Sequence, residues 1–212
     1  GGSSFHLGTQ LLKSLTARGF MSCRCSRADG FGIMPPTQPT DISKHDVANA
    51  AGSTIEKAIA LDDENEAMQI MANGACQLTT QAYNDEKIDG VVILGGSMGT
   101  DLALDVCLSL PLGFPKYIIS TIAFSPLLPT ERIPADVQMI LWAGGLYGLN
   151  SICKASLSQA AGAVLGAAKS LEKQDANKPM VGMTSFGKTV LQYMVTLKPA
   201  LEARGYEVAV FH

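Results

Sequence analysis

The sequence predicts an α/β protein, namely a three-layer domain with a mainly parallel sheet. Short runs rich in valine and isoleucine alternate along the chain with longer segments whose apolar residues recur at helical spacing. A glycine-rich turn, Gly95 to Thr100, joins one of these runs to a helical segment. Strands that alternate with helices in this way usually form a parallel sheet that helices cover on both faces.

The composition is that of a globular chain without a strong charge bias. Its 212 residues are 47% hydrophobic, enough to bury a sizeable core, and carry a formal net charge of −3. That charge gives no electrostatic support for nucleic-acid binding. No apolar run approaches the ~18 residues of a membrane span, and the first residues show no signal-peptide pattern. The five scattered cysteines are typical of reduced thiols. We therefore expect a cytoplasmic protein that binds neither nucleic acid nor membrane.

The first part of the chain is predicted to be mainly helical. The expected elements are a helix over 5–18, a strand over 20–25, a loop over 28–40, and helices over 44–51 and 62–84. Asp41 and Ser43 can cap the helix over 44–51. The acids 62–64 suit the start of the next helix, because a helix N-terminus carries a partial positive charge.

The rest of the chain alternates between strands and helices. Strands are expected over 91–94, 116–121, 137–142, 180–184 and 206–211, with helices from Thr100, over 151–170 and over about 188–204. We expect the sheet to be ordered around Val91–Leu94. A polar linker follows residue 171, so residues 1–175 are predicted to form this α/β domain. Residues 179–212 then begin a second α/β domain or complete the first.

The turn after Val91–Leu94 is the main candidate site. Gly95, Gly96 and Gly99 let a ligand approach the backbone, and Ser97 and Thr100 add hydroxyl groups. Free N–H groups of the first helical turn attract anions. Ligands of parallel sheets lie beyond the carboxyl ends of the strands, where segments 95–100, 120–126 and 143–150 are expected. We predict that the phosphates of a nucleotide, or of another phosphate-bearing small molecule, bind here.

The same turn also fits two other interpretations. Gly95-x-Ser97-x-Gly99 between a strand and a helix matches the nucleophile elbow of serine hydrolases that act on acyl substrates. Ser97 would then be the nucleophile, and His212 is the one histidine after it to serve as base. The candidate acids lie at positions 101, 105, 136 and 175. A tight turn that binds no ligand is the third interpretation.

A second glycine-containing string occurs near the end of the chain. Residues 182–189 read GMTSFGKT and satisfy the P-loop expression. Met183 and Phe186 are bulky where a phosphate cradle has small residues, so a strand–turn–helix with Gly187 required for packing is the preferred interpretation. The histidines at positions 6, 45 and 212 have no metal-ligand spacing, so we expect no metal site.

Several of these segments resemble the Tm-one-like ATP-binding family, which includes the tomato mosaic virus resistance protein. The matching segments are DGVVILGGSMGT, LPLGFPKYIISTIA, the GLN of 148–150, and MVGMTSFGKT with ARGYEVAVFH, within residues 41–212. The resemblance implies a Rossmann-like domain that binds ATP, with or without Mg²⁺. By position, it adds Ser120 and Thr121 at the end of the next strand to the residues of the glycine-rich turn.

The resemblance also implies a homodimer. The predicted helix over 151–168 is unusually rich in Ala, Ser and Gly. Small side chains let another helix approach closely, so this helix suits a position that faces a second subunit.

Overall fold

The computed structural model describes residues 42–141, 150–171, 178–185 and 187–211. The chain divides into two compact units, Gly1–Leu171 and Glu172–His212. The helix, strand and loop predicted over 5–18, 20–25 and 28–40 lie outside the described residues, as does most of the linker. Within the described part of the chain, no helix is long and apolar enough to cross a membrane.

Two short helices begin the described part of the first unit. Helix α2, Lys44–Ala50, starts as predicted, with Ser43 and Asp46 forming a reciprocal capping box. Helix α3, Ile55–Ala60, was not predicted from the sequence. Its cap is the side chain of Thr54, which accepts a hydrogen bond from the Lys57 N–H at 3.2 Å. This single cap and the buried Ile55 stabilise the helix. Its six residues are too few to show a periodic apolar pattern in the sequence.

The long helix α4, Glu64–Asn84, begins two residues later than predicted. Asp62 has a positive φ of 52°, which ends any helical path through it. Asp63 is the N-cap, and its carboxylate accepts hydrogen bonds from the N–H groups of Asn65 and Glu66. The buried face of α4 packs with α2 and α5 into one apolar cluster.

Three parallel strands form the described sheet of the first unit. They are β1, Val91–Gly95, β2, Lys116–Ser120, and β3, Val137–Leu141, in the order β1-β2-β3. The parallel α/β architecture is therefore confirmed. The expectation that the sheet is ordered around Val91–Leu94 is wrong for the described strands, because β2 is the middle one and β1 pairs with β2 alone among them. The more continuous burial of β2 agrees with its central place.

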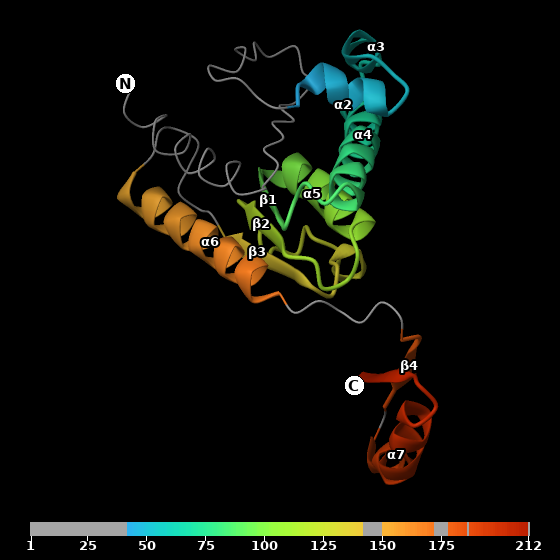
Figure 1. Cartoon of the computed structure of the whole chain (residues 1–212). Helices are drawn as coiled ribbons and strands as arrows, with labels where there is room; N and C mark the ends of the chain where they lie inside the picture. The colour runs from blue at the N-terminus through green and yellow to red at the C-terminus, as the bar shows by residue number, and fades with distance from the viewer. Residues whose placement is uncertain (1–41, 142–149, 172–177, 186, 212) are drawn as a thin grey trace. The chain divides into compact units, whose positions relative to one another are not determined.

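Helices cover both faces of this sheet, which makes the three predicted layers. Helix α5, Ser97–Ser109, packs its buried residues against a face that includes Ile93 and Ile118. Helix α6, Ser151–Ser170, packs against the other face, with Val92 and Tyr117. Figure 1 shows α5 and α6 on opposite sides of the strands. Asn150 caps α6, accepting a hydrogen bond from the Cys153 N–H at 2.9 Å.

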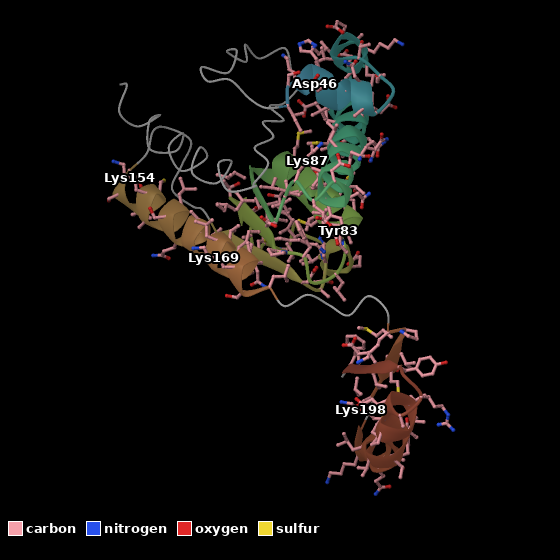
Figure 2. The ribbon with its side chains drawn as sticks, in the orientation of Figure 1. Asp46, Tyr83, Lys87, Lys154, Lys169 and Lys198 are labelled. Atoms are coloured by element: carbon pink, nitrogen blue, oxygen red, sulfur yellow. The ribbon has the colours of Figure 1, made fainter. Side chains whose placement is uncertain are left out.

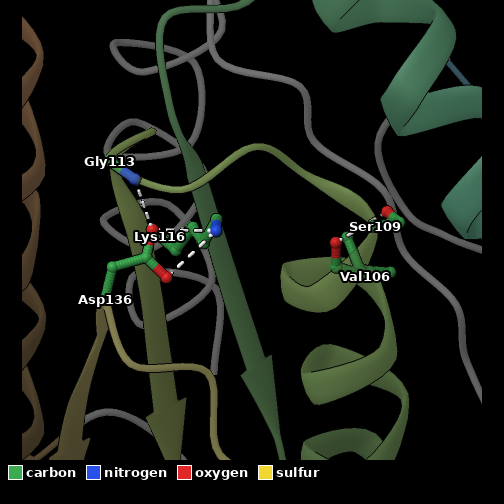
Figure 3. Close-up of polar contacts among 5 residues, drawn as sticks. All are labelled: Val106, Ser109, Gly113, Lys116 and Asp136. Atoms are coloured by element: carbon green, nitrogen blue, oxygen red, sulfur yellow. Dashed lines mark hydrogen bonds and ion pairs between the residues drawn. The ribbon is translucent and has the colours of Figure 1, made fainter. Parts of the chain in front are cut away.

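A buried ion pair joins the strands at their amino ends. The Lys116 side chain is 2% exposed, and its Nζ lies 2.9 and 3.0 Å from the two carboxylate oxygens of Asp136. The same carboxylate accepts the Gly113 N–H at 2.7 Å, so it also fixes the turn before β2 (Figure 3). This pair lies at the end of the sheet opposite to the glycine-rich turn.

The second unit is a strand–helix–strand segment. Strands β4, Met180–Thr184, and β5, Glu207–Phe211, pair in parallel, and helix α7, Gly187–Glu202, connects them. These elements lie where the sequence predicts them, within two residues at each end.

Candidate functional site

The glycine-rich turn is shorter than predicted, because helix α5 begins at Ser97 rather than at Thr100. Gly96 is the N-cap residue, with an extended backbone and no side chain to cap the helix. The N–H groups of the first turn therefore have neither an intrahelical partner nor a capping side chain from the N-cap residue. Gly96 and Ser97 are exposed, and Met98 and Gly99 are half-buried. The turn thus presents backbone donors at the positive end of a helix of 13 residues.

The first two glycines of the turn have different roles. A Cβ atom built on Gly95 would lie 2.5 Å from the carbonyl carbon of Gly99 and 2.8 Å from the Thr100 nitrogen. Gly95 is therefore required for the close approach of β1 to the first turn of α5. A Cβ atom built on Gly96 would meet only Thr121 Oγ1, at 3.8 Å. The described residues leave open space at Gly96, and none of them demands a glycine there.

The end of β2 lies directly beside this turn. The Thr121 N–H donates to the Gly95 carbonyl at 3.1 Å, so segments 95–100 and 120–126 meet at the carboxyl edge of the sheet, as predicted. The third predicted segment, 143–150, lies outside the described residues except for its last residue. Thr121 is exposed and Ser120 is fully buried. Of the two predicted site residues at the end of β2, Thr121 is the exposed one.

Thr100 does not fit its predicted role as a phosphate ligand. Its side chain is 0% exposed, and its hydroxyl lies 2.6 Å from the Gly96 carbonyl oxygen and 2.6 Å from Ser120 Oγ. Because both contacts are internal, the hydroxyl joins the turn to β2 instead of facing a ligand. The same reasoning removes the buried Ser120 hydroxyl from direct contact. The outward-facing candidates are thus Gly96, Ser97, Gly99 and Thr121.

A long loop between β2 and β3 is tied to the outer side of α5. The loop contains a single 3-10 turn, Thr130–Arg132, and the Arg132 guanidinium pairs with Asp101 and Asp105. The Arg132 Nη2 atom lies 2.6 Å from Asp105 Oδ1. This pairing neutralises carboxylates on the helix that begins at the candidate site, which favours an anion there. One signal for it was visible in the sequence, namely two aspartates four residues apart on one helical face.

Within the described part of the chain, no histidine is hydrogen-bonded to Ser97. The one histidine there, His45, lies 3.9 Å from Glu56 on α3. His212, the predicted base, lies outside the described residues, as does Asp175. The other three candidate acids are engaged elsewhere: Asp101 and Asp105 pair with Arg132, and Asp136 pairs with Lys116.

The cysteines of the described residues offer no candidate nucleophile. They are Cys76, Cys107 and Cys153, of which the last two are buried. Burial raises the pKa of the Cys107 thiol to about 12, and burial also raises the pKa of Cys76. Because the thiolate is the reactive form, both side chains are unreactive at neutral pH.

The P-loop string does not form a phosphate loop. Gly182, its first glycine, is the middle residue of β4 and pairs with Ala209. Only residues 185 and 186 separate this strand from α7, which starts at Gly187. A phosphate cradle needs a longer loop after the strand. The packing role expected for Gly187 is wrong for the described residues, because a Cβ atom there would meet none of them within 4 Å. Its φ of +72° shows that the glycine serves the backbone conformation instead.

The site is thus the N-terminal turn of a helix at the carboxyl edge of a parallel α/β sheet, the usual place for ligands in this class. A model of the Uncharacterised protein family (UPF0261) N-terminal domain matches residues 14–173. The chain belongs to this family.

The relatives are bacterial and plant proteins. A UPF0261 protein of Brucella suis is 55% identical over 201 residues, which are 91% of this chain and 48% of the relative. A UPF0261 protein of Clostridium tetani is 35% identical over 173 residues, covering 81% of this chain and 42% of the relative. The tomato (Solanum lycopersicum) ToMV resistance protein Tm-1 is 34% identical over 154 residues, 69% of this chain and 20% of the relative. These matches confirm the resemblance found in the sequence, and the chain spans about half the length of the bacterial relatives.

Proposed function

We propose that this protein binds ATP or a similar nucleotide, with the phosphates held at the N-terminal turn of α5. The observation that carries the proposal is the open Gly96 turn. Among the described residues it is a helix start whose N-cap residue supplies no capping side chain, and it lies beside the exposed Thr121. Phosphate oxygens there would accept hydrogen bonds from the backbone N–H groups of Ser97, Met98 and Gly99. The hydroxyls of Ser97 and Thr121 would supply two further donors. The choice of ATP as the nucleotide comes from the resemblance to an ATP-binding family.

The charge distribution also supports an anionic ligand. Asp101 and Asp105, the acids of α5, are paired with Arg132, so their negative charge is offset. The first turn of α5 contains no acidic residue. A phosphate group would therefore meet partial positive charge at the helix start without a nearby unpaired carboxylate from this helix.

A serine hydrolase is the second candidate, and one observation favours it. Ser97 is exposed and directly follows the turn from a buried strand to a helix, which is the position of the nucleophile in an elbow. In that case the free N–H groups of the helix would serve as an oxyanion hole rather than as a phosphate site. The two candidates differ in one measurable property, covalent labelling of Ser97 by fluorophosphonates.

We further propose that the protein is a cytoplasmic homodimer that uses α6 as its interface. Helix α6 carries the exposed glycines Gly162 and Gly166, and a Cβ atom at either would meet none of the described residues within 4 Å. Its charged residues, Lys154 and Lys169, lie near its two ends (Figure 2). A long uncharged surface of small residues permits close helix contact. A monomeric mass by light scattering at micromolar concentration would contradict the dimer.

The experiment that tests the function is a thermal-shift screen followed by calorimetry. ATP, GTP, ADP, pyrophosphate, adenosine and a short acyl ester are each added with and without Mg²⁺. The nucleotide proposal predicts that ATP raises the melting temperature and that adenosine does not. Stabilisation by the ester alone, together with fluorophosphonate labelling that Ser97→Ala abolishes, would replace the nucleotide proposal with the hydrolase.

A further inference from the structure

Two buried hydroxyl groups lie directly behind the Gly96 turn. Thr100 and Ser120 are both 0% exposed, and their oxygen atoms are 2.6 Å apart. Thr100 Oγ1 is also 2.6 Å from the Gly96 carbonyl oxygen, and Ser120 Oγ is 3.0 Å from the Ile122 nitrogen. The four groups form a continuous chain of hydrogen bonds from the loop after β2 to the N-cap of α5.

The direction of this chain is fixed by its two ends. A carbonyl oxygen can only accept, and a backbone N–H can only donate. Each hydroxyl has one proton, so the Ile122 N–H donates to Ser120, Ser120 donates to Thr100, and Thr100 donates to the Gly96 carbonyl. The reverse orientation of the central bond would leave the Gly96 contact without a proton. Buried polar groups without partners are costly, so one arrangement is strongly preferred.

We infer that Thr100 and Ser120 are positioning residues for the ligand site, and this inference rests on the proposed function. Neither hydroxyl contacts the ligand. Their bonds hold the Gly96 carbonyl on the inner side of the turn and fix the backbone between Ser120 and Ile122. Thr121 lies in that fixed segment, and its Oγ1 is 3.8 Å from the position that a Cβ atom on Gly96 would take. The chain of hydroxyls therefore sets the spacing between the two walls of the site.

This arrangement predicts coupling between the two segments. If the Thr100 hydroxyl is removed, Ser120 loses its acceptor and is free to rotate, so the Ile122 N–H loses a fixed partner. The loop after β2 and the first turn of α5 should then loosen together. A purely structural role for Thr100 would lower stability without changing how tightly the folded protein binds a ligand.

The chain offers a matched control at the other end of α5. Ser109 Oγ donates to the Val106 carbonyl at 2.8 Å and lies 3.4 Å from Thr80 Oγ1 (Figure 3 shows Ser109 and Val106). Ser109→Ala thus removes a half-buried hydroxyl from the same helix, far along it from Gly96. It should affect stability without affecting the ligand site.

The test compares Thr100→Val, Ser120→Ala, Thr100→Ser and Ser109→Ala with the parent chain. ATP affinity is measured by calorimetry, and amide hydrogen exchange is followed at Ile122 without ligand. We expect Thr100→Val and Ser120→Ala to weaken ATP binding about tenfold, the size of one to two lost hydrogen bonds. Thr100→Ser, which keeps the hydroxyl, should restore affinity to within about twofold of the parent. Ser109→Ala should leave both readouts unchanged.

The two readouts separate the possible failures. Folded Thr100→Val protein with parental ATP affinity and parental exchange at Ile122 would overturn the positioning role. In another outcome, the parent chain binds no ATP while the Thr100→Val variant exchanges the Ile122 amide faster than the parent does. That pair of results would refute the proposed function and support the coupling. If Thr100→Val fails to fold, Ser120→Ala carries the same two measurements, since it breaks the chain at its next member.

Discussion

The substitution Gly96→Val separates ligand binding from folding more sharply than any other change in the turn. The added Cβ meets only Thr121 Oγ1, at 3.8 Å, and Gly96 has a φ of −78° that any residue adopts. We therefore expect the free energy of unfolding to change by less than about 1 kcal/mol, the scale of a weakened N-cap. The two methyl groups beyond Cβ, however, would project into the space in front of the helix start.

The loss of affinity follows from the hydrogen bonds that a phosphate would make there. Each charge-assisted hydrogen bond contributes about 1.5–3 kcal/mol. If the valine prevents two of them, the cost is at least about 3 kcal/mol, or about 100-fold in the dissociation constant for ATP.

Gly95→Ala is the matched control with the opposite outcome. Its methyl group would lie 2.5 Å from the Gly99 carbonyl carbon, a backbone atom that cannot move aside easily. Overpacking of this kind costs about 1–3 kcal/mol, which lowers the melting temperature by roughly 2–12 °C for a chain of this size. Calorimetry and thermal unfolding of both variants make the comparison. Parental ATP affinity in Gly96→Val would refute the reasoning and move the phosphate elsewhere.

Two further predictions concern the core. Asp136→Ala should lower the free energy of unfolding, measured by urea denaturation, by about 3–5 kcal/mol. The reason is that the Lys116 side chain, which is 2% exposed, would lose its carboxylate partner. A loss below about 1 kcal/mol would show that the pair contributes no more than a surface ion pair. Burial raises the pKa of the Cys107 thiol from 9.0 to about 12. The unfolded thiol therefore loses its proton first, and stability should fall between pH 9 and pH 12, by up to about 1.4 kcal/mol per pH unit. Cys107→Ala should flatten this decline, and an unchanged pH profile would contradict it.

The strands were predictable because their signal is local. Runs of valine and isoleucine, bounded by glycine or proline, indicated β1, β2 and β3 to within one residue at each end. The start of α5 was not predictable, since Ser97, Met98 and Gly99 carry no helical pattern. Gly95 and Gly99 approach each other closely in the structure, and a Cβ atom on Gly95 would prevent this approach.

The partners of the site residues depended on long-range contacts. The sequence indicated Thr100 and Ser120 as polar residues near strand ends, but their pairing spans 20 residues of chain. The Arg132 pairing with Asp101 spans 31 residues and needs the whole loop to fold back over α5. The P-loop string also shows that a local pattern does not determine the structure. Residues 182–189 match the P-loop expression, but Gly182 lies inside strand β4.

The most direct test of the proposed ATP site is amide chemical-shift mapping of the labelled chain with MgATP. The nucleotide proposal predicts the largest shifts at the N–H groups of residues 96–99 and at Thr121, with pyrophosphate reproducing them and adenosine not. The Gly96→Val variant should show none of these shifts while its remaining spectrum matches that of the parent. Shifts confined to residues 185–189, or no shift at any residue at millimolar MgATP, would contradict the proposed site.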